Sequence, residues 1–218
     1  MAFGLLAASG ALAHGVAEGD AQFLRGQSGF HFWAYAYLGA KHMVTGYDHL
    51  LFLVGVVFFL RTLKDVALYV TLFAIGHSVT LVFGALLGTG ANVYIVDAVI
   101  GLSVVWKALD NLGAFANVRN WPRPQWAVFA FGLCHGLGLA TKLEELSLAE
   151  EGLLGNLLAF NLGVEVGQLL ALSLIVVLLN VWRKTSSFAR HATLANTLLM
   201  SAGFVLVGYQ LTGYFVTH

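Results

Sequence analysis

Six long apolar stretches constrain the fold of this chain more than any other feature. About 20 apolar residues let a helix cross the hydrocarbon core of a bilayer, and helix-length runs favour a helical bundle over a β-barrel, whose strands alternate in polarity. We therefore predict an all-α, polytopic membrane helix bundle with about six transmembrane helices. The stretches cover roughly residues 31–60, 66–87, 93–112, 124–142, 152–181 and 192–215.

The composition supports a membrane location and narrows the partners. Of the 218 residues, 59% are hydrophobic and only 10% are charged, whereas soluble domains have about 25% charged residues. The main partner predicted is therefore a lipid bilayer. The formal net charge is zero and no basic tract stands out, so nucleic acid is not expected as a partner. Cys134 is the single cysteine, which excludes an intrachain disulfide and a Cys-x-x-Cys metal site.

The N-terminal residues indicate that the chain enters an export pathway, and the charges of the loops indicate its orientation in the membrane. Residues 1–13 end in "ALA" after an apolar stretch and are interpreted as a signal peptide, followed by an extracytoplasmic segment, 14–30, and a single transmembrane domain, 31–218. Three segments, 61–65, 107–123 and 183–190, hold eight of the eleven Lys and Arg residues. The positive-inside rule then places both termini outside the cytoplasm, in a bacterial-type inner membrane.

A small set of ionisable side chains interrupts the predicted spans. A charged group in the membrane is costly, at least about 2.5–3.5 kcal/mol for Asp. Counted from the nearest predicted cytoplasmic charge, most of these groups lie near mid-membrane or in its outer half; His77, for example, lies about 18 Å along a helix from Asp65. Groups at similar depth on different helices can face one interior site. The set comprises His42, Asp48, His49, His77, Asp97, His135 and Glu165.

The spacing of these residues along the sequence indicates which of them share a helix face. His42 and His49 share one helix face if their helix is continuous, and Gly46 between them is where we expect a break. A polar stripe on the fifth span and a hydroxyl beside His77 are candidates to form hydrogen bonds with the metal ligands and so fix their orientation. These supporting residues are Ser78, Asn161 and Gln168, with Glu165 on the same stripe.

Imidazoles and carboxylates suit Ni²⁺, Co²⁺ or Zn²⁺ rather than Cu⁺, and the sequence has only three methionines and one cysteine. The carboxylates Asp48, Asp97 and Glu165 can either bind the metal directly or orient an imidazole through its second nitrogen. The alternative is a buried histidine–carboxylate network that only fixes the register of the helices.

Four motifs resemble, in order, the signatures of the HupE/UreJ family: "HMVTGYDHLLFLVG", "FAIGHSVTL", "FGLCHGLGLA" and "FNLGVEVGQL". This family is associated with hydrogenase and urease accessory functions, and its members are regarded as secondary nickel or cobalt permeases. The shorter Asp97 stands where family members often have a glutamate, which puts direct ligation there in doubt. The resemblance implies metal-site roles for His42, Asp48, His49, His77, His135 and Glu165.

The resulting hypothesis is a secondary permease for a divalent transition metal, with Ni²⁺ or Co²⁺ favoured and Zn²⁺ or Cu²⁺ left open. His14, which becomes the N-terminal residue if cleavage follows Ala13, and His31 are candidates for first capture of the ion outside. Two alternatives stay open: an intramembrane zinc-dependent hydrolase, and a metal-binding sensor or accessory subunit. Homo-oligomerisation is also left open.

Overall fold

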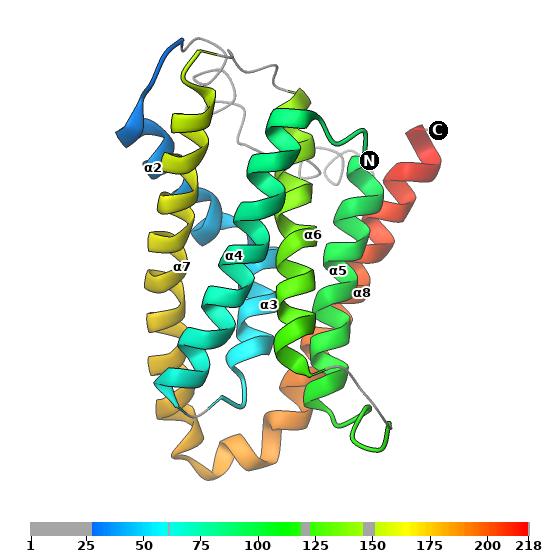
Figure 1. Ribbon diagram of the computed structural model, residues 1–218. Coiled ribbons are helices and arrows are strands. Elements are labelled where there is room, and N and C mark those ends of the chain that lie inside the picture. Colours follow the sequence, from blue (N-terminus) through cyan, green and yellow to red (C-terminus); the bar gives the residue numbers. More distant parts are fainter. Residues whose placement is uncertain (1–27, 61, 119–122, 146–150, 218) are drawn as a thin grey trace, which may run out of the picture.

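The computed structural model describes residues 28–60, 62–118, 123–145 and 151–217, which contain seven α-helices and no strand (Figure 1). The predicted signal peptide and His14 lie outside the described residues. The predicted all-α class is confirmed. The helices are α2 (Phe32–Thr45), α3 (Tyr47–Val57), α4 (Leu63–Leu87), α5 (Val93–Asn111), α6 (Pro124–Glu145), α7 (Leu153–Arg183) and α8 (Ser186–Thr217).

Four of these helices, α4, α6, α7 and α8, are long and apolar enough to cross a membrane. Helix α5 has 19 residues but carries Asp97, Lys107 and Asp110, and α2 and α3 are individually shorter, at 14 and 11 residues. A multi-pass helical membrane protein is therefore supported. The count of six spans remains a prediction, in which α2 and α3 together form one interrupted span and α5 forms another.

The outward faces of the long helices are apolar, as expected for contact with lipid. On α7 and α8, Leu170, Val177, Leu198 and Val205 are exposed large hydrophobic side chains. Only 17% of the most apolar window of α8 is buried inside the protein. An apolar surface of this extent would favour association in water, so it fits a hydrocarbon environment.

The helix starts follow local sequence signals. The Thr62 hydroxyl accepts a hydrogen bond from the Asp65 backbone N–H at 3.1 Å and donates to the Asp65 carboxylate at 2.6 Å, a reciprocal cap for α4. The Asn92 side chain caps α5 in the same way through the Ile95 N–H. Helix α6 begins at Pro124, whose missing N–H is harmless in a first turn.

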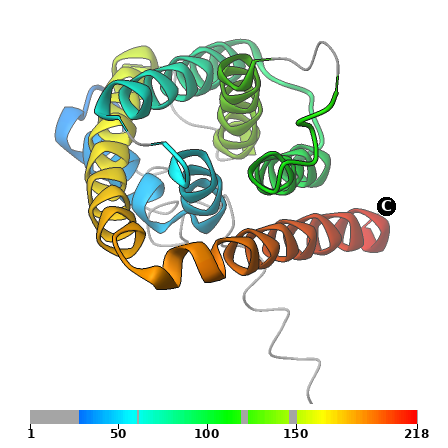
Figure 2. The same ribbon diagram turned by 90° about the horizontal axis from the view of Figure 1, so that it is seen from below.

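The break predicted near Gly46 is present. Helix α2 ends at Thr45 and α3 begins at Tyr47, while Gly46 has φ −72° and ψ 97°, an extended conformation. Seen from below, α3 lies inside a ring of the longer helices (Figure 2). Its C-terminal end is also inside the protein, where the Arg183 guanidinium donates to the Val57 and Phe58 carbonyls at 2.7 and 2.6 Å. The last carbonyl groups of this short helix therefore have a hydrogen-bond donor within the bundle.

Glycines bring the helices together in two similar pairs. A Cβ atom on Gly163 of α7 would overlap the carbonyl oxygen of Ala36 on α2, and a Cβ on Gly132 of α6 would overlap that of Phe73 on α4. The backbones of α2 and α7, and of α4 and α6, therefore touch directly, as small residues allow in membranes. In each pair the two helices run parallel, because contacts advance together along both chains.

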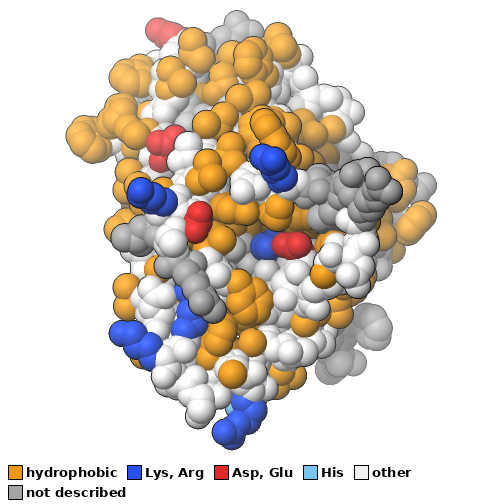
Figure 3. All heavy atoms as spheres, turned by 60° about the horizontal axis from the view of Figure 1, so that its bottom comes forward, with side chains coloured by type: hydrophobic (Ala, Val, Ile, Leu, Met, Phe, Trp, Pro, Cys, Tyr) orange, Lys and Arg blue, Asp and Glu red, His pale blue; other side chains and the backbone are white. Residues whose placement is uncertain are grey.

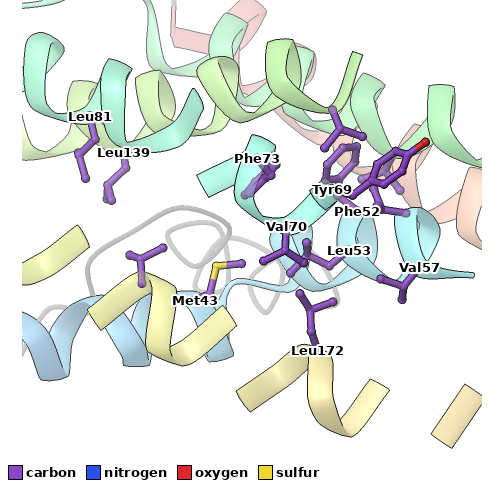
Figure 4. Close-up of a cluster of buried hydrophobic side chains, with 14 of the residues drawn as sticks. Met43, Phe52, Leu53, Val57, Tyr69, Val70, Phe73, Leu81, Leu139 and Leu172 are labelled. Carbon is purple, nitrogen blue, oxygen red and sulfur yellow. The ribbon is translucent and has the colours of Figure 1, made fainter. Parts of the chain in front are cut away.

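The third pair, α5 with α8, is antiparallel and internally symmetric. A Cβ on Gly101 would lie 3.0 Å from Val207, and a Cβ on Gly203 would lie 2.8 Å from Val105. Each helix thus offers a glycine to a valine of the other. Between the three pairs, a core of buried side chains fills the bundle; Figure 4 shows Phe52, Phe73 and Leu139 within it.

Candidate metal centre

Four histidines from four different helices meet inside the bundle. His49 on α3 is at the centre, and around it lie His42 on α2, His77 on α4 and His135 on α6. The ring centroid of His49 is 5.1 Å from that of His42, 5.8 Å from His77 and 4.7 Å from His135. His49, His77 and His135 are fully buried. The structure therefore brings four of the predicted ligands into one cluster.

Three of the imidazoles are already placed for a common ion. His42, His49 and His77 each offer a nitrogen, and these nitrogens all lie within 4.8 Å of one another. A four-coordinate ion with bonds of about 2.0–2.1 Å would draw its nitrogens to about 3.3 Å apart. Side-chain movements of about an ångström therefore convert the cluster into a coordination sphere.

Asp48 orients the central imidazole. Its Oδ1 accepts a hydrogen bond from the His49 backbone N–H at 2.8 Å and lies 3.0 Å from His49 Nδ1. A proton on Nδ1 donates to this carboxylate, which leaves the lone pair of His49 on Nε2 for a metal. Of the two roles open to Asp48, the geometry of the structure is that of an orienting group.

Gly46 leaves the space that this arrangement requires. A Cβ at Gly46 would lie 3.0 Å from His49 Nδ1, 3.2 Å from Asp48 Oδ1 and 3.0 Å from the His42 carbonyl oxygen. The helix break leaves neither the His42 nor the Gly46 carbonyl without a hydrogen bond. The His42 carbonyl accepts from the Gly46 N–H, and the Gly46 carbonyl accepts from the Leu50 N–H. The glycine therefore serves the site by its small size.

Ser103 on α5 orients His135, a role that the sequence did not reveal. The Ser103 hydroxyl donates its proton to the Ile100 carbonyl at 2.6 Å, and its oxygen lies 3.2 Å from His135 Nε2. Because the hydroxyl has a single proton, His135 Nε2–H is the donor, and Nδ1 carries the lone pair. The available signal was one serine in an otherwise apolar stretch, which spacing alone could not connect to a histidine on another helix.

A layer of phenylalanines closes one side of the histidine cluster. Phe52, Phe73 and Phe131 each lie one helical turn from a histidine, and the ring of Phe52 is 5.4 Å from Phe73 and 5.7 Å from Phe131. Phe52 and Phe73 also contact the His135 ring, at 5.4 and 5.1 Å. Helix directions place all three phenylalanines on the same side of the cluster.

Asp97 lies on the opposite side of the cluster. Its Oδ2 is 2.9 Å from Lys142 Nζ and accepts a hydrogen bond from Gln210 Nε2 at 3.2 Å. The Asp97 side chain is buried, and Lys142 is only 15% exposed. Neither Lys142 nor Gln210 was among the predicted site residues, although a lysine within the predicted fourth span was a usable signal.

Glu165 is not brought into the cluster. Its side chain is exposed on α7, while Asn161 and Gln168 on the same stripe are buried. Ser78 donates to Asn161 Oδ1 at 3.1 Å, so these two predicted supporting residues join α4 to α7. Gln168 is fully buried, and among the described residues neither its amide oxygen nor its nitrogen has a hydrogen-bond partner.

His31 lies apart from the other histidines, at the start of α2. Its backbone N–H donates to Asn156 Oδ1 at 2.8 Å, and its Nε2 lies 2.9 Å from the Ser28 carbonyl oxygen. This position is at the end of the bundle where α7 begins, on the side of the cluster away from the phenylalanine layer. A role in first capture of an ion remains a prediction.

Comparison with known protein families identifies a match over most of the chain. The profile of the family described as HupE / UreJ protein matches residues 18–218, nearly the whole chain. No curated protein and no solved structure matches the chain significantly.

Proposed function

The chain belongs to the HupE / UreJ family, and from this membership together with the histidine cluster we propose that it is a secondary permease for a divalent transition metal. The family relates to nickel and cobalt handling, so Ni²⁺ or Co²⁺ is the proposed cargo. The observation that carries the proposal is the meeting of His42, His49, His77 and His135, one from each of four helices. Four imidazoles without thiolate give borderline ligands that suit these ions.

The chemistry of the cluster favours transport over permanent retention. Neutral nitrogen ligands from four separate helices lose their common geometry when the helices shift, which releases the ion. Gln168 supports passage of a hydrated ion, because its buried amide, which has no hydrogen-bond partner among the described residues, gains hydrogen bonds when water accompanies the cargo. Cation sites of secondary transporters typically lie near the membrane centre at interrupted helices, and the break at Gly46 fits this pattern.

The proposed orientation places the phenylalanine layer toward the cytoplasm. Lys64, Arg123, Lys184 and Arg190 all lie at the bundle end where α4, α6 and α8 begin and α7 ends. Figure 3 views this end, where Lys and Arg side chains lie among apolar ones. By the positive-inside rule this end is cytoplasmic. The ion then enters from the side of Asp97 and leaves past the phenylalanines, and the chain crosses the membrane six times in total.

The test is uptake of radioactive ⁶³Ni²⁺ or ⁵⁷Co²⁺ by proteoliposomes that contain only this protein. His49→Ala should reduce initial uptake by at least about a hundredfold, and Asp48→Asn by about tenfold to a hundredfold, because orienting partners of metal ligands typically contribute that much. His191→Ala is the matched control, since this exposed histidine lies outside the cluster and its Nδ1 is within hydrogen-bond distance of Ser187 on its own helix. It should transport like the parent protein.

Two results would contradict the proposal. Unchanged uptake in both site variants would remove the histidine cluster from the pathway. Metal binding by purified protein without any uptake in proteoliposomes would instead identify a sensor or accessory subunit, the alternative that the sequence left open.

A further inference from the structure

The Asp97–Lys142 ion pair lies near the histidine cluster, toward one end of the bundle. Along α6, Lys142 follows His135 by two helical turns, or about 10 Å, on the side away from Phe131. Along α5, Asp97 precedes Ser103, the hydrogen-bond partner of His135. The ion pair therefore lies between the cluster and the end of the bundle where α5 begins.

Asp97 also approaches the cluster more closely than its ion pair alone indicates. Its Oδ1 would lie 3.4 Å from a Cβ at Gly138, a residue one turn from both Lys142 and His135. Because Gly138 has no side chain, the Asp97 carboxylate can lie against α6 at a level between Lys142 and His135.

From this geometry we propose that Asp97 is a second cation position on the path to the histidine cluster, and that the Lys142 ammonium occupies it when no metal ion is present. The inference rests on the proposed function. A divalent ion that arrives at Asp97 carries twice the charge of the ammonium and displaces it. Lys142, released, then repels the ion toward the neutral imidazoles and returns to Asp97 once the ion has moved on.

The pair also explains how a carboxylate can lie on the path without trapping the cargo. A bare buried carboxylate would hold a divalent ion strongly, because charges interact strongly where water is scarce. Lys142 makes the resting charge of the position close to zero. Gln210 donates to the same oxygen as Lys142, at 3.2 Å, and holds the carboxylate in place during the exchange.

The experiment compares charge removal at the two partners by calorimetric titration of purified protein with Co²⁺. Lys142→Gln keeps an amide donor for Asp97 but removes the positive charge, and should lower the Kd by at least about tenfold. Its uptake rate in proteoliposomes should fall, because the ion leaves Asp97 slowly. Lys142→Arg keeps the charge and is the matched control, with a Kd within about threefold of the parent. Adding Asp97→Asn to Lys142→Gln should abolish the gain in affinity.

Other outcomes separate this inference from the proposed function. If the pair only joins α5 to α6, Lys142→Gln and Asp97→Asn should lower thermal stability while the Kd of Lys142→Gln stays equal to or above that of the parent, which overturns the inference alone. If Lys142→Gln does not fold, Lys142→Met provides the same comparison of charge. Failure of the parent protein to bind or transport Co²⁺ or Ni²⁺ would overturn the proposed function itself.

Discussion

The first half of the chain, from α2 to α5, and the second half, from α6 to α8, use the same close contacts in opposite orientation. Gly39 of α2 meets the Phe160 carbonyl of α7, and Gly132 of α6 meets the Phe73 carbonyl of α4. Ala36 meets Gly163 just as Phe129 meets Gly76. This pattern describes an inverted structural repeat, in which the helices from α2 to α5 correspond to those from α6 to α8. The sequence alone does not establish it, because small residues are common along the whole chain.

The side chains at equivalent positions nevertheless differ between the halves. In the register set by these contacts, His42 matches His135, but His77 matches Val164 on α7. The break at Gly46 has no counterpart, since α6 runs unbroken through the matching residue, Leu139. The same backbone packing is thus kept in both halves, while the first half supplies three of the four imidazoles.

The same register, continued past Gly46, matches His49 to Lys142. One half therefore places an imidazole nitrogen that can bind a cation, and the other half places an amino nitrogen that forms an ion pair with Asp97. A two-fold scaffold whose halves carry different charges at equivalent positions can bind an ion first at one position and then at the next, in a fixed order. This difference is what the proposed roles of the histidine cluster and of Lys142 depend on.

The largest effects should come from filling the equivalent glycine contacts. Gly163→Ala and Gly76→Ala each place a methyl group against a backbone carbonyl, that of Ala36 and that of Phe129, and force two helices apart, at a cost of about 1–3 kcal/mol. Both should lower the melting temperature in detergent by a similar amount. Gly208→Ala is the control, because no atom lies within 4 Å of a Cβ there. A large loss in one variant and none in the other would break the equivalence of the halves.

A smaller effect is expected at the position where the halves differ most. Gly46→Ala places a Cβ between the His42 carbonyl and the Asp48–His49 pair, with contacts of 3.0 to 3.2 Å. We expect Co²⁺ affinity to fall by about tenfold, within the range for disturbed supporting groups of metal ligands. The melting temperature should stay close to that of Gly208→Ala. An unchanged Kd would show that the orientation of His49 does not depend on the glycine.

Much of the fold was predictable because each span carries its own signal. Apolar length, the Thr62 and Asn92 caps, and the glycine between His42 and His49 are local features, and the structure contains all of them. The meeting of the histidines also followed from their depth. Depth does not specify rotation about a helix axis, however, and for that reason Glu165 was expected inside although its side chain is exposed on α7.

Contacts between helices distant in sequence could not be predicted. Ser103 reaches His135 across 32 positions, and Asn111 donates to Asn196 and to the Gly55 carbonyl. Each of these polar groups could have faced any of several neighbouring helices. Their partners depend on the glycine contacts that set the helix pairs, and those contacts are a property of the assembled bundle.

The smallest effect should distinguish two serines that occupy similar apolar surroundings. Ser103→Ala removes the acceptor of His135 Nε2–H, the orienting contact of the second-half histidine, and should weaken Co²⁺ binding by about threefold to tenfold, the equivalent of one hydrogen bond. Ser78→Ala is the matched variant, because Ser78 donates to Asn161 and supports no imidazole directly; its Kd should change by less than about twofold. Equal losses in the two titrations would mean that His135 is not held by Ser103, and the second half would then contribute packing but no oriented ligand.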